Sequence, residues 1–347
     1  MRVIVGMQHP KHFWMFKNLI LAGRKKGWNF LVLAAKKDIL EELLSSSDFN
    51  YCYIGENQPT LIKKIIEYVK YLYKTYYYSR KFRPDVFIGQ AFVHFALISK
   101  IHRLPFIIYE DTEDASILHN LTIPFCKNII TPNYFTRNLG RKQIRIKSIF
   151  EFAYLHPNYF KPNSETLNLI GIGNNEKFVI IRFISWQAHH DFGQKRFTTK
   201  TKIEMIKKIE KYAKVFISSE GILPNKLKKY KIILPPTKMH DVLYYAALYI
   251  GESPTMTAES AILGTPSICL SSWAKELGNI KYLGKTDLIK AFKTDQQELA
   301  LAKALEWLKN KKIKEKWQTR LNIILKNNID VTSDMVDRLS SISRNYY

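Results

Sequence analysis

The sequence predicts an α/β protein built from two doubly wound parallel-sheet domains. Apolar runs that read as strands alternate with helical patterns from the first residue onward, which is typical of βαβ units. The length of 347 residues also exceeds what one hydrophobic core usually serves. Near the middle, residues 157–176 are rich in Pro, Asn, Gly and Ser, which indicates a linker between the two domains.

The first domain is expected to span residues 1–156. Its expected strands are 3–5, 30–34, 86–88 and 106–109, with weaker candidates at 129–130 and 148–150. Its expected helices are 14–26, which ends at Gly27, and 37–44, 61–78 and 91–102. This alternation predicts a sheet with helices on both faces.

The second domain is expected to span residues 177–325. Its five expected strands are 178–183, 215–218, 232–234, 248–250 and 267–270, and a basic helical stretch covers 296–326. Residues 326–347 form a tail, for which we allow packing back on the first domain. Two such domains in succession predict an interdomain cleft between the carboxyl ends of the two sheets, where these folds bind ligands.

The charge balance calls for an anionic partner. The chain has 54 Lys and Arg against 30 Asp and Glu, a formal net charge of +24. Phosphorylated metabolites and anionic lipid fit this charge better than nucleic acid, because the sequence shows no zinc-finger spacing, aromatic RNA-binding strand or basic zipper. We therefore expect no nucleic-acid partner.

Cysteine usage and hydropathy suit a cytoplasmic protein. The three cysteines, Cys52, Cys126 and Cys269, are widely scattered, which argues against a disulfide framework or a cysteine zinc site. The first apolar run is too short for a signal peptide, and no run approaches the roughly 18–20 apolar residues of a membrane span. Peripheral attachment to the inner face of the membrane stays open.

The stretch of residues 251–268 is the most informative motif. A strand at 248–250 ends in a turn at Ser253, Thr255 and Met256, and a helix follows that stops at Gly264. Such a turn presents backbone N–H groups and the positive end of a helix dipole to an anion. One turn further, the Glu259 carboxylate can accept hydrogen bonds from two ribose hydroxyls. The alternative is an ordinary strand-loop-helix unit with Glu259 at the surface.

Two loops of the first domain carry candidate acid–base groups. His9 and His12 follow the first strand, where a neutral imidazole can take a proton from a hydroxyl, although one can instead cap the helix and the other pack. Glu110, Glu113 and Asp114 belong to an acidic run after the strand 106–109. Their mutual repulsion favours a general base, with a solvated surface loop as the alternative.

The second domain carries a polar loop after its first strand. It contains six candidate donor-binding residues: Arg182, Trp186, His189, His190, Asp191 and Lys195. Its two adjacent histidines lack the spacing of a zinc site, so we expect no metal and instead contacts to phosphate or sugar. An ordinary loop remains the alternative for Ser219, which follows the next strand.

The motif around Glu259 resembles the donor-binding segment of GT-B glycosyltransferases and of non-hydrolysing UDP-N-acetylglucosamine 2-epimerases. In those families a Ser/Gly turn precedes a helix with a Glu, then Gly-x-Pro and a strand; Ser253, Glu259, Gly264 and Pro266 fit, while Pro254 and Thr255 replace the usual glycines. The resemblance implies a GT-B fold with two Rossmann-like domains. It also implies that the base packs near Met239 and that Ser219 lies near the diphosphate.

Across nearly its whole length, the chain is similar to domain-of-unknown-function family 354 of the GT-B superfamily. The resemblance is strongest at residues 6–18, 182–197 and 252–266. It implies an enzyme that uses a nucleotide-sugar, such as a UDP-sugar, as co-substrate and requires no other cofactor. The leading hypothesis is glycosyl transfer to a glycan or lipid-linked acceptor in surface polysaccharide or glycoconjugate synthesis.

Two alternatives stay open. The first is a UDP-sugar 2-epimerase, but those enzymes carry an Asp directly after the residue that corresponds to Gly89, where this chain has Gln90. The second is a non-catalytic GT-B scaffold that binds a polyanion or a membrane. Residues 61–81 mix helical apolar periodicity with Lys and many Tyr, which favours contact with an anionic bilayer, although such helices usually pack one face on a sheet. The sequence leaves the oligomeric state open.

Overall fold

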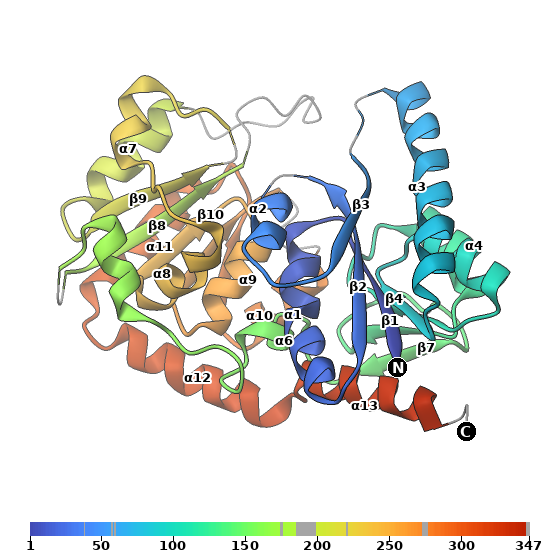
Figure 1. Ribbon diagram of the computed structural model, residues 1–347. Coiled ribbons are helices and arrows are strands. Elements are labelled where there is room, and N and C mark those ends of the chain that lie inside the picture. The colour runs from blue at the N-terminus through green and yellow to red at the C-terminus, as the bar shows by residue number, and fades with distance from the viewer. Residues whose placement is uncertain are drawn as a thin grey trace. The chain divides into compact units, whose positions relative to one another are not determined.

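The computed structural model contains two parallel sheets flanked by helices (Figure 1). It describes residues 1–37, 39–56, 58, 60–173, 176–184, 199–219, 221–272 and 277–344. The chain forms two compact units, Met1–Tyr159 with Asn328–Tyr347, and Phe160–Asn327. Every described strand pair is parallel. The α/β class is therefore confirmed.

Unit 1 holds a seven-stranded sheet in the order β3-β2-β1-β4-β5-β6-β7. The strands are β1 (Arg2–Met7), β2 (Asn29–Lys36), β3 (Tyr51–Glu56), β4 (Val86–Gly89), β5 (Phe106–Tyr109), β6 (Asn128–Pro132) and β7 (Gln143–Ile146). The central strands β4 and β5 are buried along their whole length because helices cover both faces of the sheet.

The helices of unit 1 form two layers. On one face, α1 (Pro10–Lys25) contacts α2 (Leu40–Ser45), α6 (Phe152–Leu155) and the C-terminal α13 (Val331–Arg344). The other layer contains α3 (Leu61–Phe82), α4 (Val93–His102), α5 (Ser116–Thr122) and the short 3₁₀ turn η1 (Ile123–Phe125). The predicted stop of the first helix has a clear basis, because Gly27 adopts a φ of 76° just after α1.

Unit 2 holds a five-stranded sheet in the order β12-β11-β10-β8-β9. The strands are β8 (Phe178–Phe183), β9 (Lys214–Ser219), β10 (Leu248–Gly251), β11 (Ser267–Leu270) and β12 (Ile289–Phe292). The α-helices are α7 (Thr199–Ile209), α8 (Met239–Tyr245), α9 (Pro254–Ile262), α10 (Gly278–Lys285), α11 (Gln297–Lys309) and α12 (Ile313–Asn327), and the 3₁₀ turns are η2 (Ser164–Ile170), η3 (Asn225–Tyr230) and η4 (Pro236–Lys238).

Two expected strands are wrong. Residues 148–150 are buried but follow β7 as a bend and turn. Residues 232–234 make no ladder, since Lys231 forms one isolated bridge to Ile217 and Ile233 is 81% exposed. Pro235 and Pro236 follow directly, and proline restricts the preceding residue and removes a ladder donor.

The predicted linker is packed in its first part. The backbone N–H of Asn163 and the hydroxyl of Thr166 donate to the Asp241 carboxylate at 2.9 and 3.1 Å. This segment therefore belongs to unit 2 and is no free connector.

Candidate functional site

Polar residues gather at the switch point of the sheet in unit 1. The strand order reverses direction between β1 and β4, so the loops that leave these strands diverge at their carboxyl ends, where open α/β sheets bind ligands. The β1 loop carries Gln8 and His9, His12 lies in the first turn of α1, and Gln90 follows β4 directly. Gln8, His12 and Gln90 form one hydrogen-bonded network with Asp111, which lies two residues after β5.

His12 holds this network together from a buried position. Its Nδ1 accepts from the backbone N–H of Gln8 at 2.9 Å, so the ring proton lies on Nε2, which donates to Oε1 of Gln90 at 2.6 Å. Burial lowers the pKa of His12 to about 3, although the hydrogen bond to Gln90 opposes the shift. The imidazole is therefore neutral and fully engaged, which suits positioning rather than proton removal.

Asp111 accepts the last hydrogen bond of the network. The side-chain amide of Gln90 donates to Oδ1 at 3.4 Å, and the Lys11 ammonium makes an ion pair with Oδ2. The same ammonium lies 3.8 Å from Oε1 of the fully buried Glu151. Asp111 lies in the acidic run after β5 but was not singled out there; Gln90 follows β4 directly, and Lys11 lies in the first turn of α1, so all three positions were a usable signal.

The other carboxylates of the acidic run are engaged with the backbone or exposed. Glu110 accepts from the N–H groups of Ala91, Asp111 and Thr112, and its Oε2 lies 3.8 Å from Nε2 of His119. Glu113 accepts from the N–H and hydroxyl of Thr136 at 2.8 and 2.9 Å, and Asp114 is exposed.

His9 caps α1. Its Nδ1 accepts from the N–H of Lys11 at 3.2 Å, and the residue is exposed. This is the capping role that we weighed as the alternative for one of the two histidines. Catalytic roles for His9, His12, Glu110, Glu113 and Asp114 stay predictions.

The switch point of the second sheet lies between β8 and β10. The α9 helix begins there: Ser253 is its N-cap and accepts from the N–H of Met256 at 3.4 Å, and Pro254 occupies the first helical position. Thr255 and Met256 are half-buried in the first turn, where the helix dipole favours an anion. Gly251 is required just before it, because a Cβ there would clash with the buried Tyr249 side chain, with Cζ at 2.6 Å, and would stand 2.9 Å from Cβ of Arg182.

Charged side chains surround this switch point. Nη1 of Arg182 donates to the hydroxyl of Ser218 at 2.6 Å. Glu252 accepts from the N–H of Ile184 at 2.8 Å and pairs with Lys202 at 3.2 Å, so one carboxylate ties residues on both sides of the segment 185–198. Burial lowers the pKa of Lys202, and the neighbouring Glu252 opposes this shift.

Glu259 lies one turn beyond the start of α9. It is 7% exposed, and its Oε1 lies 3.4 Å from Nε2 of His240, which comes from the first turn of α8. The sequence reasoning named the adjacent Met239 and missed His240. The structure therefore places Glu259 inside the unit rather than at a solvated surface, with an imidazole beside one oxygen.

The family model described as "Protein of unknown function (DUF354)" matches residues 1–340. The chain belongs to this family. It is 26% identical, over 82% of its own length and 86% of the relative's, to the uncharacterized protein MJ0665 of Methanocaldococcus jannaschii.

Solved structures with the GT-B fold resemble this DUF354 chain. The UDP-GlcNAc 2-epimerase of Neisseria meningitidis bound to UDP-GlcNAc has a TM-score of 0.69 at 14% identity, covering 98% of this chain and 100% of the other. The spinosyn forosaminyltransferase SpnP has a TM-score of 0.64 at 14% identity, covering 99% of each chain. The predicted GT-B fold is thus confirmed.

The structure brings the predicted residues of this DUF354 chain into two clusters, one in each unit. Unit 1 contributes the loops after β1, β4 and β5, and unit 2 contributes Arg182, Ser253, Thr255, Met256 and Glu259. Ser219 donates to the carbonyl of Gly221 at 3.0 Å after β9, and Met239 begins α8. Five residues lie outside the described part of the chain: Trp186, His189, His190, Asp191 and Lys195.

The described residues contain neither a metal-binding cluster nor a membrane-spanning helix. No group of three or more His, Cys, Asp or Glu side chains there is arranged to hold a metal ion. Likewise, no helix within the described ranges is both long enough and apolar enough to cross a bilayer.

Proposed function

We propose that this chain is a glycosyltransferase that moves a sugar from a UDP-sugar to a hydroxyl of a glycan or lipid-linked acceptor in surface polysaccharide or glycoconjugate synthesis. The observation that carries the proposal is the capped N-terminus of α9 at the β8–β10 switch point, with the buried Glu259 one turn further on. A diphosphate and a ribose diol need these two features at this spacing.

In this proposal, unit 2 binds the donor. The first turn of α9 and the Arg182 guanidinium bind the diphosphate and stabilise its negative charge as it leaves the sugar. Glu259 accepts hydrogen bonds from the ribose hydroxyls, and His240 beside it fixes the orientation of the carboxylate. A UDP donor is supported by the similar Neisseria meningitidis epimerase, whose structure has UDP-GlcNAc bound.

Unit 1 binds the acceptor, and Asp111 is the group that removes the proton from the acceptor hydroxyl. Oδ2 is held by Lys11, and Oδ1 accepts a long hydrogen bond from the Gln90 amide. The neutral His12 fixes Gln90 through its Nε2–H, so Gln90 presents its amide N–H₂ group to Asp111. His12 and Gln90 are therefore positioning residues.

Epimerisation at C2 is the second candidate, because UDP-GlcNAc 2-epimerases are among the similar structures. Gln90 weighs against it, since an amide cannot remove the proton from C2 as the Asp of those enzymes is expected to do. Incubation with UDP-GlcNAc followed by NMR of the sugar distinguishes the two reactions. Formation of the 2-epimer would show epimerisation and overturn the transferase proposal. Release of UDP that depends on an added acceptor would support the transferase.

The first experiment measures the unfolding temperature with UDP, GDP, CMP and their sugar conjugates. A ligand of the native state raises this temperature, so we expect stabilisation by UDP compounds. Glu259→Gln should weaken UDP binding by about 10- to 100-fold, because it removes the charge from hydrogen bonds worth roughly 1.5–3 kcal/mol each. The matched control is Glu306→Gln on the exposed face of α11, which should leave affinity unchanged.

The experiment also separates binding from turnover. Asp111→Asn should abolish transfer yet retain the UDP-dependent stabilisation, because Asp111 lies in unit 1. Stabilisation without turnover of any donor would favour the non-catalytic scaffold. If no nucleotide stabilises the protein, the donor site is wrong.

A further inference from the structure

The α3 helix exposes a stripe of apolar residues, although Tyr71, Leu72, Tyr78 and Phe82 of the same helix pack against the core of unit 1. Its side toward the rest of unit 1 buries the polar residues Glu67, Thr75 and Ser79, which are 5%, 0% and 1% exposed. Its outer side carries exposed apolar and aromatic residues at spacings of one, three and four: Ile62, Ile65, Ile66, Val69, Tyr73, Tyr76 and Tyr77. A helix on a sheet normally presents polar residues on its outer side.

The exposure of this face is large. Ile62 is 73% exposed, and Ile65, Ile66 and Val69 each exceed 50%. On the inner face, Glu67 accepts from the N–H of Glu56 and from Lys70, and Ser79 contacts His102, whereas the buried hydroxyl of Thr75 has no hydrogen-bond partner among the described residues. Tyr76 stacks on His102, but Ile62, Ile65, Ile66 and Val69 stay more than half exposed, which indicates another contact for this part of the stripe.

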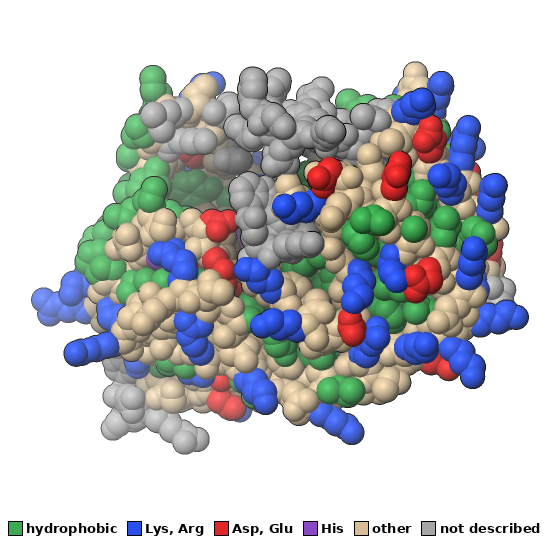
Figure 2. All heavy atoms as spheres, turned by 180° about the vertical axis from the view of Figure 1, so that it is seen from behind, with side chains coloured by type: hydrophobic (Ala, Val, Ile, Leu, Met, Phe, Trp, Pro, Cys, Tyr) green, Lys and Arg blue, Asp and Glu red, His purple; other side chains and the backbone are tan. Residues whose placement is uncertain are grey.

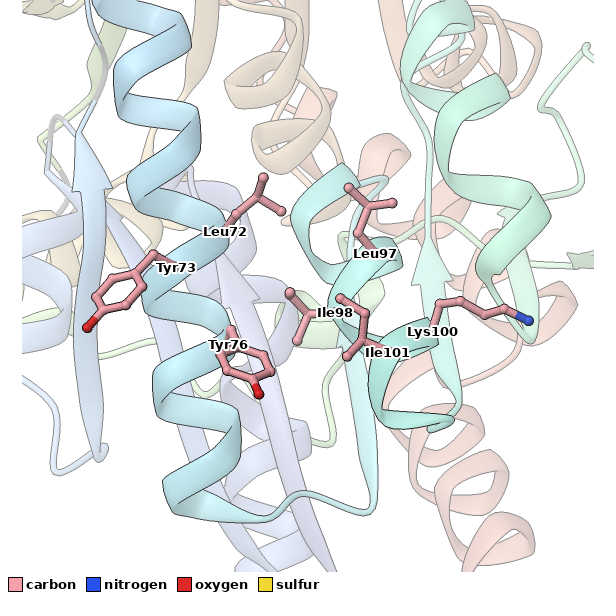
Figure 3. Close-up of a pocket in the computed structure, with 7 residues that line it drawn as sticks. All are labelled: Leu72, Tyr73, Tyr76, Leu97, Ile98, Lys100 and Ile101. Atoms are coloured by element: carbon pink, nitrogen blue, oxygen red, sulfur yellow. The ribbon is translucent and has the colours of Figure 1, made fainter.

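An apolar groove of about 520 Å³ continues this stripe between α3 and α4 (Figure 3). Leu72 and Tyr76 of α3 face Leu97, Ile98 and Ile101 of α4 across it. Ile101 is 63% exposed. On α5, which contacts α4, three more residues are exposed: Ile117, Leu118 and Leu121. We call the outer surfaces of α3, α4 and α5 the apolar face.

Most charges on the three helices of the apolar face are positive, although the exposed Asp114 lies just before α5. In α3, α4 and α5 the only acidic residue is Glu67, which is buried and paired with Lys70. Exposed cations border the stripe and the groove: Lys63, Lys70, Arg80, Lys81, Arg83, Lys100 and Arg103. Figure 2 shows the hydrophobic side chains gathered along the left edge of the molecule, with Lys and Arg side chains below them.

We propose that the apolar face is a docking surface for an anionic phospholipid bilayer. Isoleucine side chains enter the acyl boundary, tyrosine rings lie at headgroup depth, and the cations meet acidic headgroups. A second copy of the chain is the less suitable occupant, because two such faces would bring like charges together in a protein of net charge +24.

The surface adjoins the candidate acceptor edge. The α3 helix begins directly after the carboxyl end of β3, on the edge of the sheet that carries His9, Gln90 and Asp111, and Ile62 to Val69 form its first half. Docking through this half brings that edge toward the lipid surface. The proposal does not depend on the reaction, since binding to vesicles is measured without any substrate.

The test is co-sedimentation of the full chain with vesicles of phosphatidylglycerol and phosphatidylcholine, compared with pure phosphatidylcholine. We expect binding to the anionic vesicles that weakens between about 0.1 M and about 1 M salt, because the Debye length falls from about 10 to about 3 Å. Ile62→Glu/Ile66→Glu should weaken this binding at least about tenfold. The matched control, Ile233→Glu/Ile323→Glu, changes exposed isoleucines of unit 2 and should leave it unchanged.

A second measurement places the contact without disturbing it. In Val69→Trp, an exposed position of α3, the emission in excess of wild type, which has six tryptophans of its own, should shift to the blue and be quenched by brominated lipid. The proposal fails if wild type does not bind anionic vesicles, if the α3 double variant binds like wild type, or if vesicles leave the emission of the Val69→Trp variant unchanged. It also fails if wild type is a dimer that the α3 double variant dissociates.

Discussion

Lowering the pH should destabilise unit 1 through two buried histidines at the acceptor edge. His12 and His94 are 5% and 3% exposed, and burial lowers the pKa of each to about 3. In the unfolded chain both rings return to a pKa of about 6.5. Between pH 6.5 and pH 3 the unfolded state therefore binds protons that the native state does not, so stability falls as the pH falls.

The expected magnitude follows from the two pKa values. At pH 5 each histidine contributes a loss of about 2 kcal/mol, from about 1.5 pH units at 1.36 kcal/mol each, and the pair about 4 kcal/mol. For a protein whose net stability is on the order of 5–15 kcal/mol, this is a large fraction. His12→Gln keeps an amide N–H for Gln90 and removes one titrating group, so the loss at pH 5 should be about 2 kcal/mol smaller.

The assay combines urea unfolding between pH 5 and pH 7.5 with NMR of the imidazole nitrogens. We expect His12 to remain neutral with its proton on Nε2 at pH 5, since Nδ1 accepts from the backbone N–H of Gln8. A His12 ring that titrates near pH 6.5 in the folded protein, or a stability that does not change over this range, would refute the reasoning.

Further predictions concern the second switch point and the C-terminal helix. Gly251→Ala should cost about 1–3 kcal/mol by overpacking against Tyr249 and Arg182, whereas Gly284→Ala in α10, where a Cβ meets nothing within 4 Å, should be neutral or stabilising; thermal unfolding compares the two. Asp330→Ala should cost about 1–2 kcal/mol, because Asp330 accepts from the N–H of Ser333 at the start of α13 and from the Tyr159 hydroxyl. Hydrogen exchange should then quicken in α13, and unchanged protection there would contradict that role.

Sequence reasoning found the central strands of both sheets and missed most of the edge strands. The missed strands β3, β7 and β12 each lie at the edge of a sheet, while β4, β5, β10 and β11 are buried throughout. An edge strand has one neighbour and a partly solvated surface, so polar residues interrupt it, as in the Gln-Ile-Arg-Ile sequence of β7. An apolar run is therefore a signal mainly of central strands.

The sequence was sufficient to predict which loops carry the candidate site, but not which of their side chains meet. Polar residues after β1, β5, β8 and β10 were recognisable because parallel strands end at one edge of a sheet. Which carboxylate of the acidic run meets Lys11 depends on how the backbone turns after Tyr109: Glu110 folds back to the N–H of Ala91, and Asp111 faces the network. The spacing of these residues along the sequence does not reveal this backbone turn.

The identity of residue 90 connects the network to the proposed reaction. The position after β4 accepts the Nε2–H of His12 and also donates to Asp111, and the Gln90 amide can do both because it carries a carbonyl oxygen and an N–H₂ group, whereas a carboxylate can only accept. An aspartate there would stand beside Asp111 as a second negative charge and would draw a proton onto His12. Gln90 avoids both effects, so Asp111, which is paired with Lys11, is the one carboxylate that the hydrogen bonds from His12 through Gln90 reach. One carboxylate that receives a proton from a hydroxyl is sufficient for transfer to an acceptor. Exchange at a sugar carbon requires a second group to return the proton on the opposite face, and Gln90 cannot be that group.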